Sequence, residues 1–251
     1  MFLPHDYVLH VTGEPLARDV TAGDANNLLA SGAGCLPPVA GAVYGTLLND
    51  VGSLAALGNA VHEAPYKAPP KAPILYVKPR NSIVGHRSAV EVPAEGAQLG
   101  ASLGIVIGRV ACRVSEADAL KYVAGYVTVA DLSVPHENVY RPSVRFRARD
   151  GFCVIGPCAV AKKFVANPDS LAISVEINGE RVFRADTSTA LRGVARLLSD
   201  VTEFMTLSSG DVLTLGVPHG APVAYANDSV RIAIGDLPPL EFSLVAQKGI
   251  Q

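Results

Sequence analysis

The sequence predicts an α+β fold built around a large, mostly antiparallel or mixed sheet. Short runs of β-branched and other apolar residues outnumber the segments with helical periodicity. Only two segments repeat apolar residues at helical spacing, and they do not alternate regularly with the strand-like runs, which argues against a doubly wound sheet. The chain has 251 residues, 49% of them hydrophobic and 18% charged, which is enough for one well-packed core.

The two helices are expected over 115–125 and from about 187 or 188 to 205. Ser115 precedes Asp118 as in a capping box, and apolar residues follow at helical spacing. Thr187 or Ser188 could cap the second helix. Its apolar stripe comprises Leu191, Val194, Ala195, Leu198, Val201 and Phe204.

The strands are expected where β-branched residues concentrate. The runs are ILYVK (74–78), LGIVIG (103–108), YVTVADLSV (126–134), AISVEING (172–179), VLTLGVP (212–218) and VRIAIG (230–235). Asn178-Gly179 is a hairpin signal. The first stretch should be a buried strand that ends in Lys78. Residues 1–41, rich in small side chains, are interpreted as an N-terminal extension, and residues 42–251 as the main domain.

Charge and composition exclude several classes of function. The net charge is −2 and the basic residues are dispersed, so no nucleic-acid partner is expected. No apolar run reaches the length of a membrane span, so no membrane association is expected. The four cysteines form no CxxC pair and follow no secretory leader, which indicates reduced thiols and a cytoplasmic location.

A series of short motifs carries the strongest functional signal. In order they are Lys78-Pro79-Arg80-Asn81, LGASLGIVIGRV (99–110), AGYVTVADLS (124–133), YRPSVRFRARDGFCVIGP (140–157), VEINGE (175–180) and TLSSGDVLTLGVPHG (206–220). Their order and spacing resemble the fumarylacetoacetate hydrolase family over roughly residues 43–247. The resemblance implies a mixed β-roll or sandwich with peripheral helices.

Within that family, two stretches are similar to the isomerase/decarboxylase branch of 4-hydroxyphenylacetate (homoprotocatechuate) degradation. They are PYKAPPKAPILYVKPRNSIVG and YRP…RDGFCVIG. Active family members use Mg²⁺ to chelate a 2-oxo acid or its enol. The resemblance implies a small di- or tricarboxylate substrate, 5-oxopent-3-ene-1,2,5-tricarboxylate, which is decarboxylated to 2-hydroxyhepta-2,4-dienedioate and then isomerised. It also implies a homodimer, or a heteromer with a catalytically intact paralogue.

The resemblance places the metal ligands on one strand and its neighbour. The two glutamates of the family strand fall on Gly100 and Ser102, and the third ligand, an aspartate, matches Asp131. Alternation puts residues 100 and 102 on one face, from which neither can chelate a metal. The Mg²⁺ of the family is therefore doubtful in this chain. Asp131 is a metal-ligand candidate, or a residue that caps a turn.

The resemblance also gives catalytic and substrate-binding candidates. The family's loop lysine matches Arg147, which keeps the cation but cannot act as a neutral base. The family's lid histidine falls on Val51, and His62-Glu63 could substitute for it or form a surface pair. The substrate-binding candidates, whose alternatives are bracing the sheet or pairing with surface acids, are Lys78, Tyr140 and Arg141.

Three functions follow as alternatives. The first is an isomerase/decarboxylase subunit with an incomplete metal site that supports a catalytic partner. The second is an active Mg²⁺-dependent hydrolase, decarboxylase or isomerase of 2-oxo acids, with Asp131 and substrate oxygens sharing the metal, or a metal-free enzyme using Arg147 and His62. The third is a non-catalytic protein that binds dicarboxylates.

Overall fold

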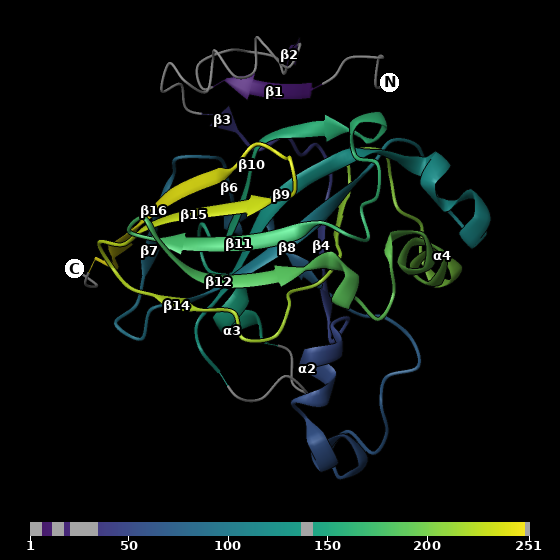
Figure 1. The fold of residues 1–251 in the computed structure, drawn as a ribbon, viewed down its shortest axis with the longest axis horizontal. Helices are drawn as coiled ribbons and strands as arrows, with labels where there is room; N and C mark the ends of the chain where they lie inside the picture. The colour runs from purple at the N-terminus through teal and green to yellow at the C-terminus, as the bar shows by residue number, and fades with distance from the viewer. Residues whose placement is uncertain (1–6, 12–17, 21–34, 137–142, 249–251) are drawn as a thin grey trace.

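Two β-sheets pack face to face and form the body of the protein (Figure 1). The computed structural model describes residues 7–11, 18–20, 35–136 and 143–248. The larger sheet has the strand order β2-β1-β10-β9-β8-β13-β4-β5, with β14 paired to β8, β3 to β1 and β6 to β10. The smaller sheet has the order β12-β11-β15-β16-β7. Most pairs are antiparallel and three are parallel, β10–β6, β13–β4 and β16–β7, so the predicted α+β class with a mixed sheet is confirmed.

The strands of the larger sheet include the two longest in the described chain, β8 and β9. Its members are β1 (Tyr7–Val11), β2 (Arg18–Val20), β3 (Cys35–Leu36), β4 (Val43–Leu47), β5 (Ile74–Lys78), β6 (Ile83–Val84), β8 (Ala97–Ile107), β9 (Val123–Ser133), β10 (Cys153–Ala161), β13 (Val212–Thr214) and β14 (Val223–Ala224). The smaller sheet comprises β7 (Ala89–Val92), β11 (Ala172–Ile177), β12 (Glu180–Asp186), β15 (Ser229–Ile234) and β16 (Leu240–Ala246). The predicted Asn178-Gly179 turn joins β11 to β12.

The helices are short and lie at the periphery (Figure 1). The α-helices are α2 (Val51–Ala55), α3 (Val144–Arg147) and α4 (Val194–Phe204). The 3₁₀ helices are η1 (Gly58–His62), η2 (Arg80–Ser82), η3 (Glu116–Tyr122), η4 (Lys162–Phe164) and η5 (Thr187–Thr189). No helix among the described residues is long and apolar enough to cross a membrane.

Both predicted helices differ from those observed. The 115–125 segment is the 3₁₀ helix η3, because Ser115 bonds the Asp118 side chain rather than a backbone N–H, and Val123 already belongs to β9. The second helix begins at Val194 instead of 187 or 188. The N–H of Val194, one of the N–H groups that have no partner within the helix, donates to Asp169 Oδ1 at 2.7 Å.

The core lies between the two sheets, and a second apolar cluster covers the other face of the larger sheet. Strands β8 and β9 contribute to both clusters, which explains why they are buried along nearly their whole length. Leu99, Leu103 and Leu132 face the smaller sheet, whereas Val106 and Val129 face away from it. Apart from Gln98 and Ala124, the side chains on β8 and β9 are therefore dry, and a polar one needs a partner.

Strand β5 is an edge strand rather than the buried strand that its apolar sequence predicts. It ends the larger sheet, and the side chains of Val77 and Ile74 are 57% and 37% exposed. Lys78, the charged residue of the strand, is only 2% exposed. Lys78 is thus more deeply buried than the apolar residues of β5, although hydrophobicity predicts the opposite.

The predicted boundary at residue 42 stays a prediction. β1, within residues 1–41, pairs with β10 of the larger sheet in antiparallel register, Tyr7 opposite Val160. The backbone at the start of the chain thus extends the main sheet.

His86 is a buried titratable group beside the smaller sheet. Its Nδ1 accepts a hydrogen bond from the Glu241 N–H at 3.1 Å, so the ring is neutral with its proton on Nε2. Burial and the neighbouring Arg87 lower the pKa of His86, and Glu241 opposes them. The folded state therefore takes up a proton at lower pH than the unfolded state does.

We predict that stability falls as the pH drops below about 6.5, the unfolded pKa of histidine. The slope contributed by His86 is at most about 1.4 kcal/mol per pH unit, the limit for one proton. His86→Asn keeps an acceptor oxygen for the Glu241 N–H without a titrating ring. Urea unfolding of both proteins at pH 7.5 and 5.5 should show a smaller loss for the variant, and equal losses would contradict this role.

Candidate functional site

The predicted ligand positions meet on one face of the larger sheet. In the β8–β9 ladder Gly100 lies opposite Asp131. Alternation puts residues 100, 102 and 131 on the face that also carries Val106 and Val129, away from the smaller sheet. The shared face of residues 100 and 102 agrees with the predicted alternation, and the β8–β9 register adds Asp131 to it. Their side chains, however, do not form a metal site.

A buried ion pair occupies the centre of this face. Lys78 Nζ lies 2.6 Å from Asp131 Oδ1, and both side chains are 1% exposed. The ammonium also donates to three backbone carbonyls, those of Leu132 at 2.9 Å, Phe152 at 2.8 Å and Arg147 at 3.0 Å. Lys78 therefore joins β5 to β9 and to the loop before β10. This geometry fits the alternative in which Lys78 braces the sheet.

Tyr76 and Arg147 complete the surroundings of Asp131. The Tyr76 hydroxyl donates to Asp131 Oδ2. Arg147 lies over the Tyr76 ring, with its NH1 3.3 Å from the Tyr76 hydroxyl and 3.8 Å from Asp131 Oδ1. Burial and the Asp131 charge raise the pKa of Tyr76 far above its usual value, so the phenol stays protonated. The Tyr76 ring crosses Gly45 on β4, where a Cβ would collide with it.

The two positions that carry glutamate in the family are filled by other groups. A Cβ on Gly100 would lie 2.5 Å from the Asp131 carbonyl oxygen and 2.7 Å from Val217 Cγ2. The Ser102 hydroxyl donates to the Gly216 carbonyl at 2.8 Å and accepts from the Gly216 N–H at 3.1 Å. The loop that follows β13 therefore packs into the space where chelating side chains would project.

The described residues at this site do not fit Mg²⁺. Mg²⁺ prefers several oxygen ligands at about 2.1 Å. Among the described residues Asp131 is the one carboxylate on this face, and Lys78 and Tyr76 already contact its two oxygens. In the described part of the chain, no group of three or more His, Cys, Asp or Glu residues could hold a metal ion. A divalent ion at Asp131 would also stand a few ångström from the Lys78 ammonium.

A cavity of about 300 Å³ opens beside this cluster. Polar residues from several elements line it, among them Tyr76, Gln98, His136, Arg147 and His219. Apolar residues complete the wall, namely Leu47, Leu48, Leu57, Val217 and Pro218. The arrangement is a small pocket with a cationic end and an apolar body, which suits a short anionic molecule.

Two polar atoms of this wall are buried without a hydrogen-bond partner among the described residues, Arg147 Nε and His136 Nε2. His136 is held by its Nδ1, 2.8 Å from the Val134 carbonyl oxygen, and by stacking on Phe146 at 4.8 Å between ring centroids. A buried donor or acceptor without a partner costs free energy, so a ligand that pairs with it gains affinity.

Asp50 holds the part of the cavity wall that Ser53 and His219 form. Its carboxylate accepts from Ser53 N at 2.8 Å, from His219 N at 3.0 Å and from Thr189 Oγ1 at 2.6 Å. Burial raises the pKa of Asp50, but these hydrogen bonds outweigh it and the net pKa is lowered. Asp50 thereby caps α2 and ties it to the 217–221 loop. Val51, on which the family's lid histidine falls, is 54% exposed, whereas His219 packs against Gly52.

The sequence-predicted residues divide between this site and the surface. Asp131, Lys78 and Arg147 lie together, as expected from the motifs. His62 and Glu63 are exposed at the end of η1, which projects with α2 from the sheets (Figure 1), and they are not among the cavity-lining residues. Tyr140 and Arg141 lie outside the described residues. The roles of all these residues stay predictions.

Sequence reasoning missed Tyr76, His136 and His219 as wall residues. Tyr76 could have been found, because it stands two positions before Lys78 and so shares its face of β5. His136 and His219 are not among the residues that the sequence motifs point to. Their convergence depends on the loops after β9 and β13, whose paths no local pattern indicates.

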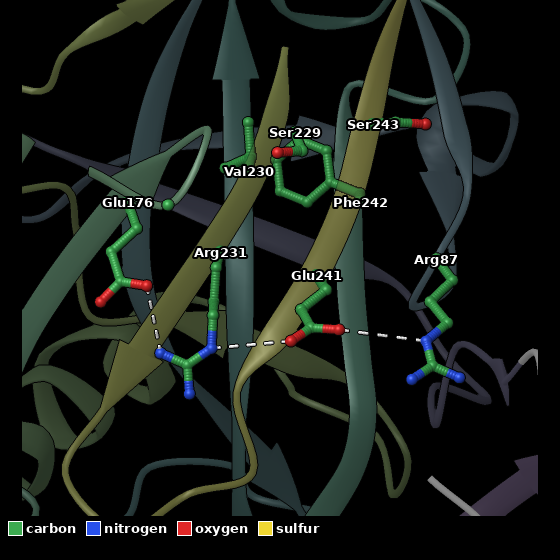
Figure 2. A pocket seen from close by; sticks show the side chains of 9 residues that line it. Arg87, Glu176, Ser229, Val230, Arg231, Glu241, Phe242 and Ser243 are labelled. Atoms are coloured by element: carbon green, nitrogen blue, oxygen red, sulfur yellow. Dashed lines mark hydrogen bonds and ion pairs between the residues drawn. The ribbon is translucent and has the colours of Figure 1, made fainter. Parts of the chain in front are cut away.

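A second cavity, of about 360 Å³, lies on the smaller sheet. Figure 2 shows a row of alternating charges across it, in which Arg231 NH1 lies 3.4 Å from Glu176 and its Nε 3.6 Å from Glu241, with Arg87 3.9 Å from the other side of Glu241. These side chains are mostly half-exposed and pair with one another, so the row is a surface ion-pair network rather than a reactive centre.

Comparison with known proteins identifies the family. The family model described as fumarylacetoacetate (FAA) hydrolase C-terminal matches residues 42–245. The chain belongs to the fumarylacetoacetate hydrolase family. This confirms the resemblance inferred from the motifs. The matched range contains the strands that carry Lys78, Gly100, Ser102 and Asp131.

Similar proteins include enzymes of aromatic catabolism. The chain is 36% identical over 211 residues to the 4-hydroxyphenylacetate degradation bifunctional isomerase/decarboxylase of Escherichia coli, a match that covers 84% of this chain and 48% of that protein. The chain thus spans about half the length of this relative. It is also 32% identical over 201 residues to 2,4-didehydro-3-deoxy-L-rhamnonate hydrolase of a Sphingomonas strain, covering 77% and 70%.

Solved structures share the fold. The 2-hydroxyhepta-2,4-diene-1,7-dioate isomerase of Mycobacterium marinum superposes with a TM-score of 0.73 and 25% identity, covering 95% of this chain and 83% of that one. Fumarylpyruvate hydrolase of Pseudomonas aeruginosa, solved with Mn²⁺ and pyruvate, gives 0.72 at 21% identity, covering 98% and 99%. That structure of the same fold therefore holds a divalent metal.

We predict that Lys78→Met lowers the free energy of unfolding by about 3–5 kcal/mol, because it leaves the Asp131 carboxylate buried without its cation. Adding Asp131→Asn should cost less than the sum of the two single effects, since the charge that lacks a partner is then gone. Urea unfolding measures both. The control is Lys121→Met, which breaks the exposed Lys121–Asp118 pair and should cost less than about 1 kcal/mol. Equal effects of Lys78→Met and the control would contradict the role of the buried pair.

We also predict that Gly100→Ala destabilises the protein by about 1–3 kcal/mol, because the added methyl group overlaps the Asp131 carbonyl and Val217. Thermal unfolding measures it. Ser243→Ala, on the exposed face of β16, serves as a control and should change stability by less than about 0.5 kcal/mol. If Gly100→Ala left the thermal stability unchanged, position 100 would have room for a side chain, and Val217 would not fill the space of a metal ligand there.

Proposed function

We propose that this chain is a subunit of the 4-hydroxyphenylacetate-pathway isomerase/decarboxylase whose own metal site is incomplete, and that it supports a catalytically intact paralogue in the cytoplasm. The observation that carries the proposal is that other groups occupy the face of the larger sheet on which the family's metal ligands would stand. Val217 stands where a side chain at position 100 would project, Ser102 is bonded to Gly216, and Asp131 is paired with Lys78.

The length of the relatives supports a partner chain. The Escherichia coli bifunctional enzyme is about twice as long as the region it shares with this chain, so it has room for a second domain of this size. In our proposal a separate chain, with both glutamates of the E-x-E strand, takes the place of that second domain. The substrate of the assembly is 5-oxopent-3-ene-1,2,5-tricarboxylate, and its product is 2-hydroxyhepta-2,4-dienedioate.

A second candidate function rests on the cavity. Arg147, His136 and His219 line it together, and no Asp or Glu is among the described residues of its wall. That composition favours a protein that binds dicarboxylates without turning them over. The enzyme alternative, in which Asp131 and substrate oxygens hold Mg²⁺, is less favoured because Lys78 and Tyr76 occupy the carboxylate.

The test is turnover of the tricarboxylate by the purified chain, alone and mixed with a paralogue that has both glutamates. We expect no turnover by the chain alone, with Mg²⁺ or with EDTA. The mixture should turn the substrate over faster, or for longer, than the paralogue does by itself. An active family member supplied with the same substrate is the positive control. Mg²⁺-dependent turnover by the chain alone would contradict the proposal and make Asp131 the first residue to mutate.

A further inference from the structure

We propose that β5, the apolar edge strand of the larger sheet, pairs with β5 of a second copy of this chain, so that the sheet continues across a two-fold axis. The contact is a backbone ladder between two identical edge strands. This inference goes beyond the homodimer that the family resemblance implies, because it assigns the surface, the register and the hydrogen bonds. It does not depend on the proposed function.

β5 lacks the features by which proteins protect a free sheet edge. Such edges usually carry exposed charges, prolines or bulges that prevent pairing with another chain. In β5 the side chains of Val77 and Ile74 are 57% and 37% exposed, whereas the charged residue, Lys78, is turned inward and paired with Asp131. β12, the free edge of the smaller sheet, instead exposes the charged residues Glu180, Arg181 and Arg184. The contrast indicates that β5 is the edge that a partner covers.

The hydrogen bonds of β4 show which of its backbone groups face β5. The N–H of Thr46 points to β13, where Thr214 Oγ1 accepts from it at 3.2 Å. The Ala42 carbonyl points the same way and accepts from the Val212 N–H at 2.9 Å. Successive residues of a strand direct their backbone groups to opposite sides. The even-numbered residues of β4 therefore face β13, and the odd-numbered ones face β5.

Two residues of β5 are left with unpaired backbone groups. The odd-numbered residues of β4 lie opposite Ile74, Tyr76 and Lys78, so these three use their backbone groups within the sheet. Leu75 and Val77 direct theirs to the free side. None of these two N–H and two C=O groups has a hydrogen-bond partner among the described residues.

A second copy of β5 satisfies all four groups at once. Hydrogen bonds in an antiparallel pair are exchanged between residues whose backbone groups both point to the other strand. Leu75 of each copy then lies opposite Val77 of the other, which gives two reciprocal pairs and four hydrogen bonds. Tyr76 lies opposite its own copy at the two-fold axis. No other symmetric register pairs all four groups, because Pro73 and Pro79, the next residues at which pairing is possible, have no N–H.

An apolar groove at the end of β5 accommodates the residues that flank the ladder. A cavity of about 500 Å³ lies there, and its apolar lining residues include Leu36, Pro37, Val39, Val77, Pro79 and Ile83. In the proposed register, Pro73 and Ile74 of the second copy come to this end of the strand. The apolar surface that Ile74 exposes in a single chain is then covered, which adds hydrophobic burial to the backbone hydrogen bonds.

The experiment is analytical ultracentrifugation of the full chain over a range of concentrations, and we expect a dimer. Val77→Lys places a charge opposite Leu75 of the second copy and should raise the dissociation constant of the dimer at least about tenfold. The matched control is Val182→Lys, which alters an exposed valine on the other free edge, β12, and should change that constant less than about twofold. Circular dichroism verifies that each variant is folded.

Hydrogen exchange gives a second readout that needs no variant. The amides of Leu75 and Val77 have no partner within one chain, so they should exchange slowly only when the dimer is formed. A monomer at all concentrations, fast exchange of both amides in a dimer, or equal effects of Val77→Lys and Val182→Lys would overturn the inference. A chain that is monomeric alone and pairs only with the paralogue would also overturn it, while the proposed function would stand.

Discussion

The buried pair of Lys78 and Asp131 is the interaction on which the rest of the site depends. A lysine on an edge strand can be buried only if its ammonium protons find acceptors and its charge finds a partner. Here three carbonyls accept the protons, and the Asp131 carboxylate balances the charge. Those acceptors come from β9 and from the segment between α3 and β10. The pair therefore fixes the edge of the sheet, the path of the Arg147 loop and the protonation state of Tyr76 together.

The same pair explains how a member of a metal-binding family can keep its fold without the ligands. Losing two glutamates from a dry face would leave space and unbalanced charge. In this chain Val217 and the Ser102–Gly216 hydrogen bonds fill the space. Lys78 balances the one carboxylate that remains. The face is packed, and its ion pair is neutral. Arg147, which lines the neighbouring cavity, carries a positive charge there.

Local patterns predicted the parts of the molecule whose structure is locally determined. The β-branched runs, the Asn178-Gly179 hairpin and the shared face of residues 100 and 102 follow from period and turn chemistry. The patterns failed where distant residues decide. The helix start at Val194 depends on Asp169, the burial of Lys78 depends on carbonyls of two other segments, and the cavity wall depends on loops after β9 and β13. None of these contacts leaves a signal at the position it controls.

The most direct test of the central claim is whether the isolated chain binds a divalent ion at Asp131. Mn²⁺ is a suitable probe, because it is bound in a solved structure of the same fold and its free form is measured by electron paramagnetic resonance. The account predicts that the chain leaves the signal of millimolar Mn²⁺ unchanged, whereas an active family member reduces it stoichiometrically. Saturable binding of one Mn²⁺ per chain that is lost in Asp131→Asn would contradict it.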